Sequence, residues 1–515
     1  MSDHMMSIVS LTAGLPGLIE TCIHGGEFFV SRLDTYRQAD QRIAEFLQMF
    51  SLHWDFQRDA LKKLASLEPR LDEDVKQRFI QVLESLRRLL EKASSTISKY
   101  TIPTSVAAGP SAVQKLRYAL LEEKVLATLE KEITAWENRF LMRLTVLVDM
   151  GSVDSTTTLA SGSKNAKVNM RVPLLRLKDG SSVEVLQSPG ELRSFEKENT
   201  TSGIYQTSDP TVLVELYEAQ YSDDPKQRVE DLAGSLCAAE PDLMHIMPCM
   251  GYMKSGFGVS KPGLLFRYPV STQGMKPRSL RSLLLEPSIK HPLEDRVRMA
   301  LELATAVWYI HSGGFVHKCI RPETILVFVE EADSSLPPDS SYSKYPWKLG
   351  PSFLAGFTRF RSDDRAFESG RNEDSEVSRY CYRHPRRWGI VAQEKFSMLH
   401  DIYSLGVILL EIGLWNSLLE WKNSQDKLPL GLAALLRGYT LEQVTTDPSL
   451  VRTRLIDTAK RQLPRVMGSK YTAVVVSCLS CVEGGLTTSS KGLADRNPAL
   501  AYMEAVVERL EEIEL

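Results

Sequence analysis

The cysteines of this chain are the first residues whose type and spacing could carry chemistry. The chain has 7 cysteines among 515 residues, and one pair, Cys478 and Cys481, forms a C-x-x-C motif. A zinc site needs two further Cys or His ligands nearby, and none follows at metal-binding spacing. An odd number of widely spaced cysteines indicates free thiols in a reducing compartment. We therefore expect no metal site and interpret the pair as two thiols on one helix.

A second group of reactive side chains lies in residues 311–328, HSGGFVHKCIRPETILVF. This segment resembles the catalytic loop of protein kinases, usually H-R-D-L-K-P-x-N-I-L. Further on, residues 400–411, HDIYSLGVILLE, resemble the kinase helix with the pattern D-x-W-S-x-G-V. The two motifs occur in the kinase order and at a compatible separation. The resemblance implies a protein-kinase-like fold over roughly residues 180–515.

The residues that would react in a kinase are replaced in this sequence. Cys319 stands where an aspartate accepts the proton of the substrate hydroxyl, and Thr324 stands where an asparagine binds magnesium. Gly356 stands where D-F-G places its metal-binding aspartate, and Glu215 where V-A-I-K places the phosphate-pairing lysine. A carboxylate at that last position repels a triphosphate. The resemblance therefore implies no catalytic residue, no magnesium ligand and at most weak binding of ATP.

The residues that would shape a kinase fold are retained. His317 and Phe357 match side chains that pack in the core of kinases, and Arg321 keeps a positive charge at the lysine position of the loop. Asp401 matches an aspartate that hydrogen-bonds the backbone of the catalytic loop, and Gly406 lies in the same helix motif. Loss of reacting positions beside retained scaffold positions is typical of a pseudokinase, a kinase fold used for binding or switching.

Two other interpretations of this region stay open. A divergent active kinase would draw its carboxylates from elsewhere, such as the acidic run of Asp363, Asp364 and Glu368. An unrelated α+β domain would match the two motifs by chance. Three further segments resemble divergent kinase-like domains of filamentous fungi, which are often joined to one particular N-terminal module: residues 246–252, 264–269 and 382–385.

The elements that must position these residues follow from apolar periodicity. Residues 211–214 and 263–268 predict strands, and residues 296–311 predict a helix, so strands come first and helices later. This order is typical of a two-lobed α+β unit, which we place at residues 171–515. Residues 151–170, rich in Ser, Thr and Gly, predict a linker.

Residues 1–150 predict an all-α helical bundle. Apolar residues recur there at steps of three and four, as expected for helices that bury one face. The stripes consist of Ile43, Phe46, Phe50, Trp54, Leu61, Leu64, Phe79, Leu83, Leu86, Leu90, Leu126, Leu129, Ile133, Trp136, Phe140, Leu144 and Leu147. A further helix near residues 5–32 would complete four. The expected fold class is therefore multidomain: a four-helix bundle followed by an α+β bilobal protein-kinase-like fold.

The start of the chain carries a resemblance of its own. Residues 8–23, IVSLTAGLPGLIETCI, with Cys22 and the aromatic pair Phe28 and Phe29, resemble the opening of HeLo domains. These are also named HET-S/LopB or prion-inhibition-and-propagation domains. Two later segments fit the same family: residues 50–54 and 115–124. The family implies fungal programmed cell death or heterokaryon incompatibility, in which the N-terminal helix leaves the bundle and permeabilises the plasma membrane.

A bundle followed by a pseudokinase is also the order of the mixed lineage kinase domain-like protein of animals. The resemblance implies self-oligomerisation through the bundle, plasma-membrane lipid as a target on activation, and an activating protein of unknown identity. The uncharged residues 5–19 would supply the membrane-active side chains, with Pro16-Gly17 lowering helix stability. Those side chains are Leu11, Leu15, Leu18 and Ile19. Two interpretations remain beside this one: plain bundle core, and a passive scaffold that binds another helical protein.

Composition sets the expected partners and compartment. The chain has 62 Lys and Arg against 65 Asp and Glu, a net charge of -3, and a nucleic-acid binder usually shows a basic excess. The N-terminus lacks the positive region and cleavage site of a secretory signal. Residues 5–19 are shorter than the roughly 20 apolar residues that span a bilayer. We expect no nucleic-acid partner and a cytoplasmic protein that associates with the membrane on activation.

Overall fold

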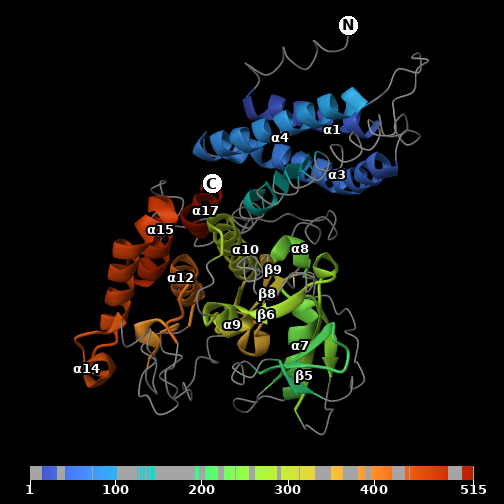
Figure 1. Cartoon of the computed structure of the whole chain (residues 1–515). Coiled ribbons are helices and arrows are strands. Elements are labelled where there is room, and N and C mark those ends of the chain that lie inside the picture. Colours follow the sequence, from blue (N-terminus) through green and yellow to red (C-terminus); the bar gives the residue numbers. More distant parts are fainter. Residues whose placement is uncertain are drawn as a thin grey trace, which may run out of the picture. The chain divides into compact units, whose positions relative to one another are not determined.

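The computed structural model divides the chain into two compact units, residues 1–162 and 163–515 (Figure 1). It describes residues 14–31, 41–71, 73–100, part of 125–144, 192–195, 203–217, 225–237, 239–253, 261–286, 291–312, 314–330, 349–362, 381–388, 396–419, 435–439, 441–484 and 501–513. Over these residues the first unit is helical, and the second combines antiparallel sheets with helices. This confirms the prediction of a helical N-terminal region followed by an α+β region.

Three long helices make up most of the described first unit: α1 (Gly14–Ser31), α3 (Gln41–Leu67) and α4 (Glu73–Tyr100). Residues between 125 and 144 add further helical positions. α1 packs against both α3 and α4. The predicted stripes supply the buried side chains, among them Phe50, Trp54, Leu61, Leu64, Phe79, Leu83, Leu86, Leu90, Leu129, Ile133, Trp136, Phe140 and Leu144. Burial of one apolar face stabilises such helices in water.

Polar and aromatic contacts fix how α4 meets its neighbours. Trp136 stacks on Phe140 with 5.0 Å between ring centroids, and its Nε1 donates a hydrogen bond to the carbonyl of Val82 at 2.8 Å. The thiol of Cys22 on α1 donates to the carbonyl of Leu83 at 3.4 Å. A buried indole N–H needs such a partner, and here it finds one on the helix beside it.

The predicted start of the first helix, near residue 5, lies outside the described residues, and the described part of α1 begins at Gly14. Pro16 lies in the first turn of that part. Leu11 lies outside the described residues, as do residues 115–124 and the predicted linker. Within the part of the chain that is described, no helix has the length and apolar character needed to cross a bilayer.

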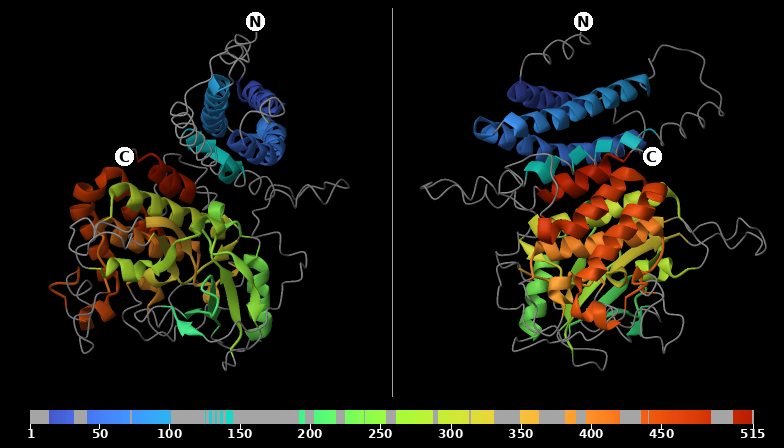
Figure 2. Two further views of the ribbon diagram at one scale, coloured as in Figure 1. Left: turned by 45° about the vertical axis from the view of Figure 1, so that its right-hand side comes forward. Right: turned by 90° about the vertical axis from the view of Figure 1, so that its left-hand side faces the viewer.

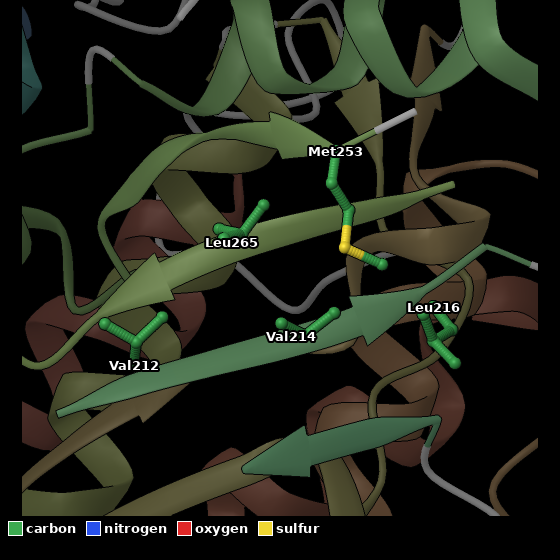
Figure 3. Packing of buried hydrophobic residues seen from close by; sticks show 5 residues of the cluster. All are labelled: Val212, Val214, Leu216, Met253 and Leu265. Carbon is green, nitrogen blue, oxygen red and sulfur yellow. The ribbon is translucent and has the colours of Figure 1, made fainter. Parts of the chain in front are cut away.

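The second unit opens with a five-stranded antiparallel sheet in the order β1-β2-β3-β5-β4. Its strands are β1 (Arg193–Ser194), β2 (Ile204–Gln206), β3 (Val212–Leu216), β4 (Cys249–Met253) and β5 (Gly263–Arg267). Helix α7 (Pro225–Leu236) packs against β4 and β5, and the short α8 (Pro241–Met244) follows it. Side chains from three of the strands form a buried apolar cluster (Figure 3): Val212, Val214, Leu216, Met253 and Leu265.

Two smaller antiparallel sheets follow. One has the order β6-β8-β9, with β6 (Lys276–Ser279), β8 (Ile325–Val329) and β9 (Leu349–Leu354), and the other pairs β7 (Phe315–Val316) with β10 (Arg361–Ser362). The helices are α9 (Leu280–Leu284), α10 (Leu293–Ser312), α12 (Met398–Leu414), α14 (Leu441–Thr446), α15 (Ser449–Gly484) and α17 (Glu508–Glu511). Short 3-10 turns occupy Val270–Thr272, Pro322–Thr324, Phe357–Arg359 and Pro385–Arg387, and Met503–Val507 is a π-helical turn.

The predicted strands at residues 211–214 and 263–268 and the predicted helix at residues 296–311 are confirmed as β3, β5 and α10. α10 is buried on nearly all sides in its second half, because other elements of the unit surround it. α12 and α15 lie side by side (Figure 2). Gly406 permits this approach, since a Cβ there would lie 2.8 Å from the Cβ of Cys478.

A second glycine, Gly26 on α1, makes an equally close contact. A Cβ built at Gly26 would lie 1.8 Å from the ring of Trp54 on α3. The same indole stacks on Phe50 with 5.7 Å between centroids, and Phe50 meets Phe29 of α1 edge-on at 4.8 Å. The aromatic side chains of α3 therefore fill the space that the glycine leaves.

Replacing Gly26 with Ala tests this packing. The added methyl group overlaps the Trp54 ring, so ring or helix must move, which in packed cores costs about 1–3 kcal/mol. We expect that loss in the free energy of unfolding of residues 1–162, measured by urea denaturation with circular dichroism. Glu20→Ala, at an exposed position of α1, should change it by less than about 0.5 kcal/mol. Equal effects of the two substitutions would contradict the close packing.

Candidate functional site

The loop after β7 is held by one buried carboxylate of α12. Asp401 accepts hydrogen bonds from the backbone N–H of His317 at 2.7 Å and of Lys318 at 2.9 Å. Lys318 adopts left-handed backbone geometry, with φ of 69°, which turns its N–H toward the same carboxylate as its neighbour. His311 on α10 lies 3.3 Å from Asp401. Burial opposes ionisation, but these hydrogen bonds outweigh it and hold the pKa of Asp401 below its ordinary value.

Both ring nitrogens of His317 form hydrogen bonds with backbone groups. Its Nδ1 accepts a hydrogen bond from the N–H of Cys319 at 3.2 Å, so the ring proton lies on Nε2, which donates to the carbonyl of Ala355 at 3.1 Å. Burial lowers the pKa of His317 to about 4, so the ring is neutral at physiological pH. Phe357 packs edge-on against it at 4.9 Å. Both ring nitrogens are used, and neither is available as a base.

The remaining loop residues bond mainly to the loop itself. The hydroxyl of Thr324 lies within donating distance of the carbonyls of Cys319, at 2.7 Å, and Arg321, at 2.9 Å, and it accepts from the N–H of Arg321 at 3.3 Å. Thr324 and Arg321 are buried, and Cys319 is half-buried. The N–H of Ala355 donates to the carbonyl of Thr324 at 2.8 Å, which fixes the end of β9 against the loop.

The carboxylate of Glu215 occupies an anion site made of backbone amides. Glu215 lies on β3 and is 1% exposed, and its oxygens accept hydrogen bonds from the N–H groups of Gly356 and, at 2.8 Å, Phe357. Successive N–H groups aimed at one point form a concave site that suits an anion. Burial raises the pKa of Glu215 to about 7, and the two amide hydrogen bonds oppose that rise. The chain's own side chain thus fills this site.

Gly356 leaves no room for a side chain at its position. It has φ of +86°, a geometry that favours glycine, and a Cβ there would lie 2.7 Å from the Cβ of Thr324. The acidic residue that a kinase carries here would therefore collide with Thr324. With a carboxylate at Glu215 and no acidic side chain at Cys319, Thr324 or Gly356, the residues present do not fit a magnesium–triphosphate complex. Over the described residues, no group of three His, Cys, Asp or Glu side chains could hold a metal ion.

The structure brings most of the predicted site residues together. Cys319, Arg321 and Thr324 share one loop with His317, and the Gly356–Phe357 pair meets this loop through the contacts above. The acidic run at residues 363–368, the alternative source of carboxylates, lies outside the described residues. Gly406 lies away from the loop contacts, on the face of α12 that meets α15. The predicted pair Cys478 and Cys481 is buried on α15, neither forms a disulfide, and the thiol of Cys481 donates to the carbonyl of Leu399 at 3.3 Å.

Sequence reasoning missed a buried ionic network beneath the loop. Arg281 of α9 donates to the carboxylate of Glu323 at 3.0 Å, to the hydroxyl of Tyr382 at 3.0 Å and to the hydroxyl of Ser417. Tyr382 donates in turn to Glu411 on α12 at 2.9 Å. Glu411 stands alone in an apolar run, and that is the sequence signal that could have revealed it, since buried charges are nearly always paired. Arg281, which follows Lys276 and Arg278 closely, carries no such signal.

The two carboxylates of this network differ in their surroundings. Burial raises the pKa of both groups. For Glu323 the charges of Arg281 and Arg321 and its hydrogen bonds together outweigh burial and lower the pKa overall. For Glu411 burial dominates and raises the pKa to about 7, against the opposing charge of Arg281. Two guanidinium groups therefore act on Glu323, whereas Glu411 is compensated only in part.

Comparison with known proteins supports a kinase-like region over a short stretch. No family model matches the chain. A stretch of 74 residues, 14% of the chain, is 39% identical to the dual specificity protein kinase shkA of Dictyostelium discoideum. This match spans 13% of the length of that protein. The similarity indicates a kinase-like region in this chain, and the HeLo resemblance of residues 1–150 stays a prediction.

The buried state of Glu215 predicts an unusual dependence of stability on pH. Its pKa is raised from 4.5 to about 7 in the folded chain, so its contribution is full below pH 4.5 and is lost as pH rises through 7. That shift corresponds to about 3 kcal/mol. We expect Glu215→Gln to gain about that much relative to the unsubstituted chain between pH 4.5 and pH 7.5, measured by urea unfolding.

Glu240→Gln is the matched control, because Glu240 is exposed. Its free energy of unfolding should follow that of the unsubstituted chain across the same pH range. A Glu215→Gln difference that does not change with pH would show that the Glu215 carboxyl titrates normally, and the prediction that burial outweighs the two amide hydrogen bonds would then be wrong.

Proposed function

We propose that this chain is a signalling protein in which a pseudokinase controls a membrane-targeting cell-death effector. The pseudokinase would comprise residues 171–515, and the effector would be a HeLo-like four-helix bundle at residues 1–150, joined to it by a linker at residues 151–170. One observation carries the pseudokinase part of the proposal: the carboxylate of Glu215 fills the amide site at Gly356 and Phe357. The effector part rests on the HeLo resemblance.

The site supports binding or switching rather than phosphoryl transfer. Phosphoryl transfer needs positive charge and metal around the phosphates and a carboxylate to orient the hydroxyl that attacks. Glu215 fills the amide site with its own carboxyl group and supplies no positive charge, and Cys319 supplies a thiol in the loop. His317, whose two ring nitrogens are engaged, offers no replacement base. What remains is a rigid loop, anchored through Asp401, on which a partner or ligand could act.

Burial in α1 is consistent with a membrane-active helix. Leu15, Leu18 and Ile19 are all buried within the first unit. Moving these side chains from a bundle core into a bilayer keeps them out of water in both states, so the hydrophobic contribution changes little. Contacts between copies of the bundle would offset the polar groups that enter with them. The two states are the bundle with α1 packed inside it and the bundle with α1 inserted in the bilayer. A partner, ligand or modification at the pseudokinase would then need to supply only the difference in free energy between these two states.

A second function, protein phosphorylation, is favoured by the match to a dual specificity protein kinase. In that case the native chain would transfer phosphate from Mg·ATP to a hydroxyl, and Cys319→Asp would change nothing, since the carboxylate would come from another residue. The absence of any acidic side chain at positions 319, 324 and 356 argues against it.

Nucleotide binding separates these two functions. A nucleotide at 100 times its dissociation constant stabilises a binding protein by about 2.7 kcal/mol. We expect millimolar Mg·ATP to leave the thermal unfolding midpoint of the full chain unchanged, and we expect no phosphate transfer in a radiolabel assay. An active dual specificity kinase serves as the positive control. Transfer of the γ-phosphate by the native chain would establish the second function instead.

The effector part is tested by leakage of dye from anionic liposomes. We expect residues 1–162 to release the dye, the full chain to release much less, and residues 21–162 to release none, because the last lacks the apolar start of α1. Circular dichroism would show whether each fragment is helical. Glu20→Ala in residues 1–162 is the matched control and should leak normally. Leakage by residues 21–162 would remove the first helix from the mechanism, and leakage by none of them would leave the scaffold function.

A further inference from the structure

The first part of helix α15 carries an excess of basic side chains. The backbone of Gly468 is not helical, so residues 449–467 form a helix of their own at the edge of the second unit (Figure 1). Between residues 449 and 470 the only acidic residue is Asp457. The same stretch has these basic residues: Arg452, Arg454, Lys460, Arg461, Arg465 and Lys470. This local excess contrasts with the net charge of -3 of the whole chain.

Part of this charge lies on one side of the helix and is open to solvent. Lys460, Arg461 and Arg465 are exposed, and no ion pair joins any of them to a carboxylate of the described residues. Positions 454, 461 and 465 follow one another at steps of seven and four, which places them on the same side of a helix. At 1.5 Å per residue they extend over about 16 Å. Lys470 is not part of this row, because its Nζ donates to the carbonyl of Glu512 at 2.7 Å.

Arg454 extends the row toward residues 435–439. Its guanidinium lies over the ring of Tyr439, 4.8 Å from the centroid, and its Nη2 donates to the carbonyl of Arg437 at 3.3 Å. Arg437 is exposed, and Tyr439 is 37% exposed. We call five residues the basic face of α15: Arg437, Arg454, Lys460, Arg461 and Arg465.

The basic face of α15 suits an extended anionic surface. One small anion cannot contact cations spread over about 16 Å. A protein partner usually needs large apolar anchors at the centre of its interface. Among the described residues the large apolar side chains that are exposed are Phe28, Val270 and Tyr439, and none of them lies on α15. Tyr439, with an apolar ring and a polar hydroxyl, is of the type that lies at the boundary between lipid and water.

We propose that the basic face of α15 binds the phosphate groups of an anionic lipid bilayer. Guanidinium groups donate paired hydrogen bonds to phosphate oxygens, and a cluster of about four to eight Lys and Arg on a helix attracts anionic lipids. The contact is electrostatic and inserts no helix into the bilayer. The inference stands on residues of the second unit and does not depend on the proposed effector function of residues 1–150.

The test is sedimentation of the full chain with vesicles of phosphatidylcholine, with and without phosphatidylserine. We expect binding only to the vesicles that contain phosphatidylserine, and release when the salt rises from about 50 mM to about 500 mM, since salt screens exposed charges. One basic residue near an anionic surface raises the binding constant roughly fivefold. The variant that combines Lys460→Glu, Arg461→Glu and Arg465→Glu should therefore bind at least about tenfold more weakly.

The control variant makes the same change of charge at three exposed residues elsewhere in the second unit: Arg193→Glu, Lys261→Glu and Arg267→Glu. It should bind like the unsubstituted chain. Circular dichroism and the thermal unfolding midpoint show whether each variant is folded. A milder variant with Gln at positions 460, 461 and 465 removes the charges without reversing them, and it should bind more weakly than the unsubstituted chain and more tightly than the Glu variant.

Three results would overturn the proposal. Unchanged binding by the Glu and Gln variants would assign lipid binding to other residues, and no binding of the unsubstituted chain to anionic vesicles would exclude it. Tighter binding to duplex DNA or to a polyglutamate peptide than to the vesicles would assign the basic face of α15 to another polyanion. Dye release, which tests the effector proposal, is a separate measurement, so a failure of that proposal leaves the outcome of the sedimentation test unchanged.

Discussion

The geometry of the second unit depends on the carboxylate of Asp401. It is buried on α12 and accepts the two successive amides of His317 and Lys318. An uncompensated buried carboxylate costs several kcal/mol. The loop amides therefore stabilise α12 by compensating the charge of Asp401, and Asp401 in turn stabilises the loop. Once those amides are fixed, Lys318 takes its left-handed backbone and the ring of His317 reaches the carbonyl of Ala355. The order of the loop follows from this one contact.

A second carboxylate repeats this arrangement on the other side of the same aromatic contact. Asp401 binds the amides of residues 317 and 318, and Glu215 binds those of residues 356 and 357. Between the two anchors, His317 and Phe357 meet edge-on. The carboxylates differ in pKa because Asp401 also has His311 beside it, whereas burial dominates at Glu215. Each anchor holds one half of the contact that joins the loop to β9.

Much of the fold could be predicted from the sequence, because apolar spacing alone defines a strand at residues 211–214 or a helix at residues 296–311. The loop and Asp401 could be located by motif. The partners of Glu215 could not, since they lie 141 and 142 positions away and are backbone groups, which leave no trace in side-chain spacing.

The ionic network of Arg281 shows a further limit of sequence reasoning. A lone charged residue in an apolar run, such as Glu411, can be recognised as buried, but the partners in this network come from distant elements. Glu323 lies 42 positions from Arg281, and Tyr382 lies 101 positions from it. Pairing at such separations is decided by the packing of whole helices. The sequence therefore indicates that a buried charge needs a partner without identifying it.

The crowding between Gly356 and Thr324 has a consequence for substitutions at both positions. An acidic residue at position 356 would meet the Cβ of Thr324 and would also require a backbone that side chains rarely adopt. A single substitution of Gly356 by an acidic metal ligand is therefore destabilising on its own, and it becomes tolerable only after position 324 and the local backbone have changed as well. The effects of substitutions at positions 356 and 324 on stability are therefore expected to be non-additive, because the two side chains would compete for the same space.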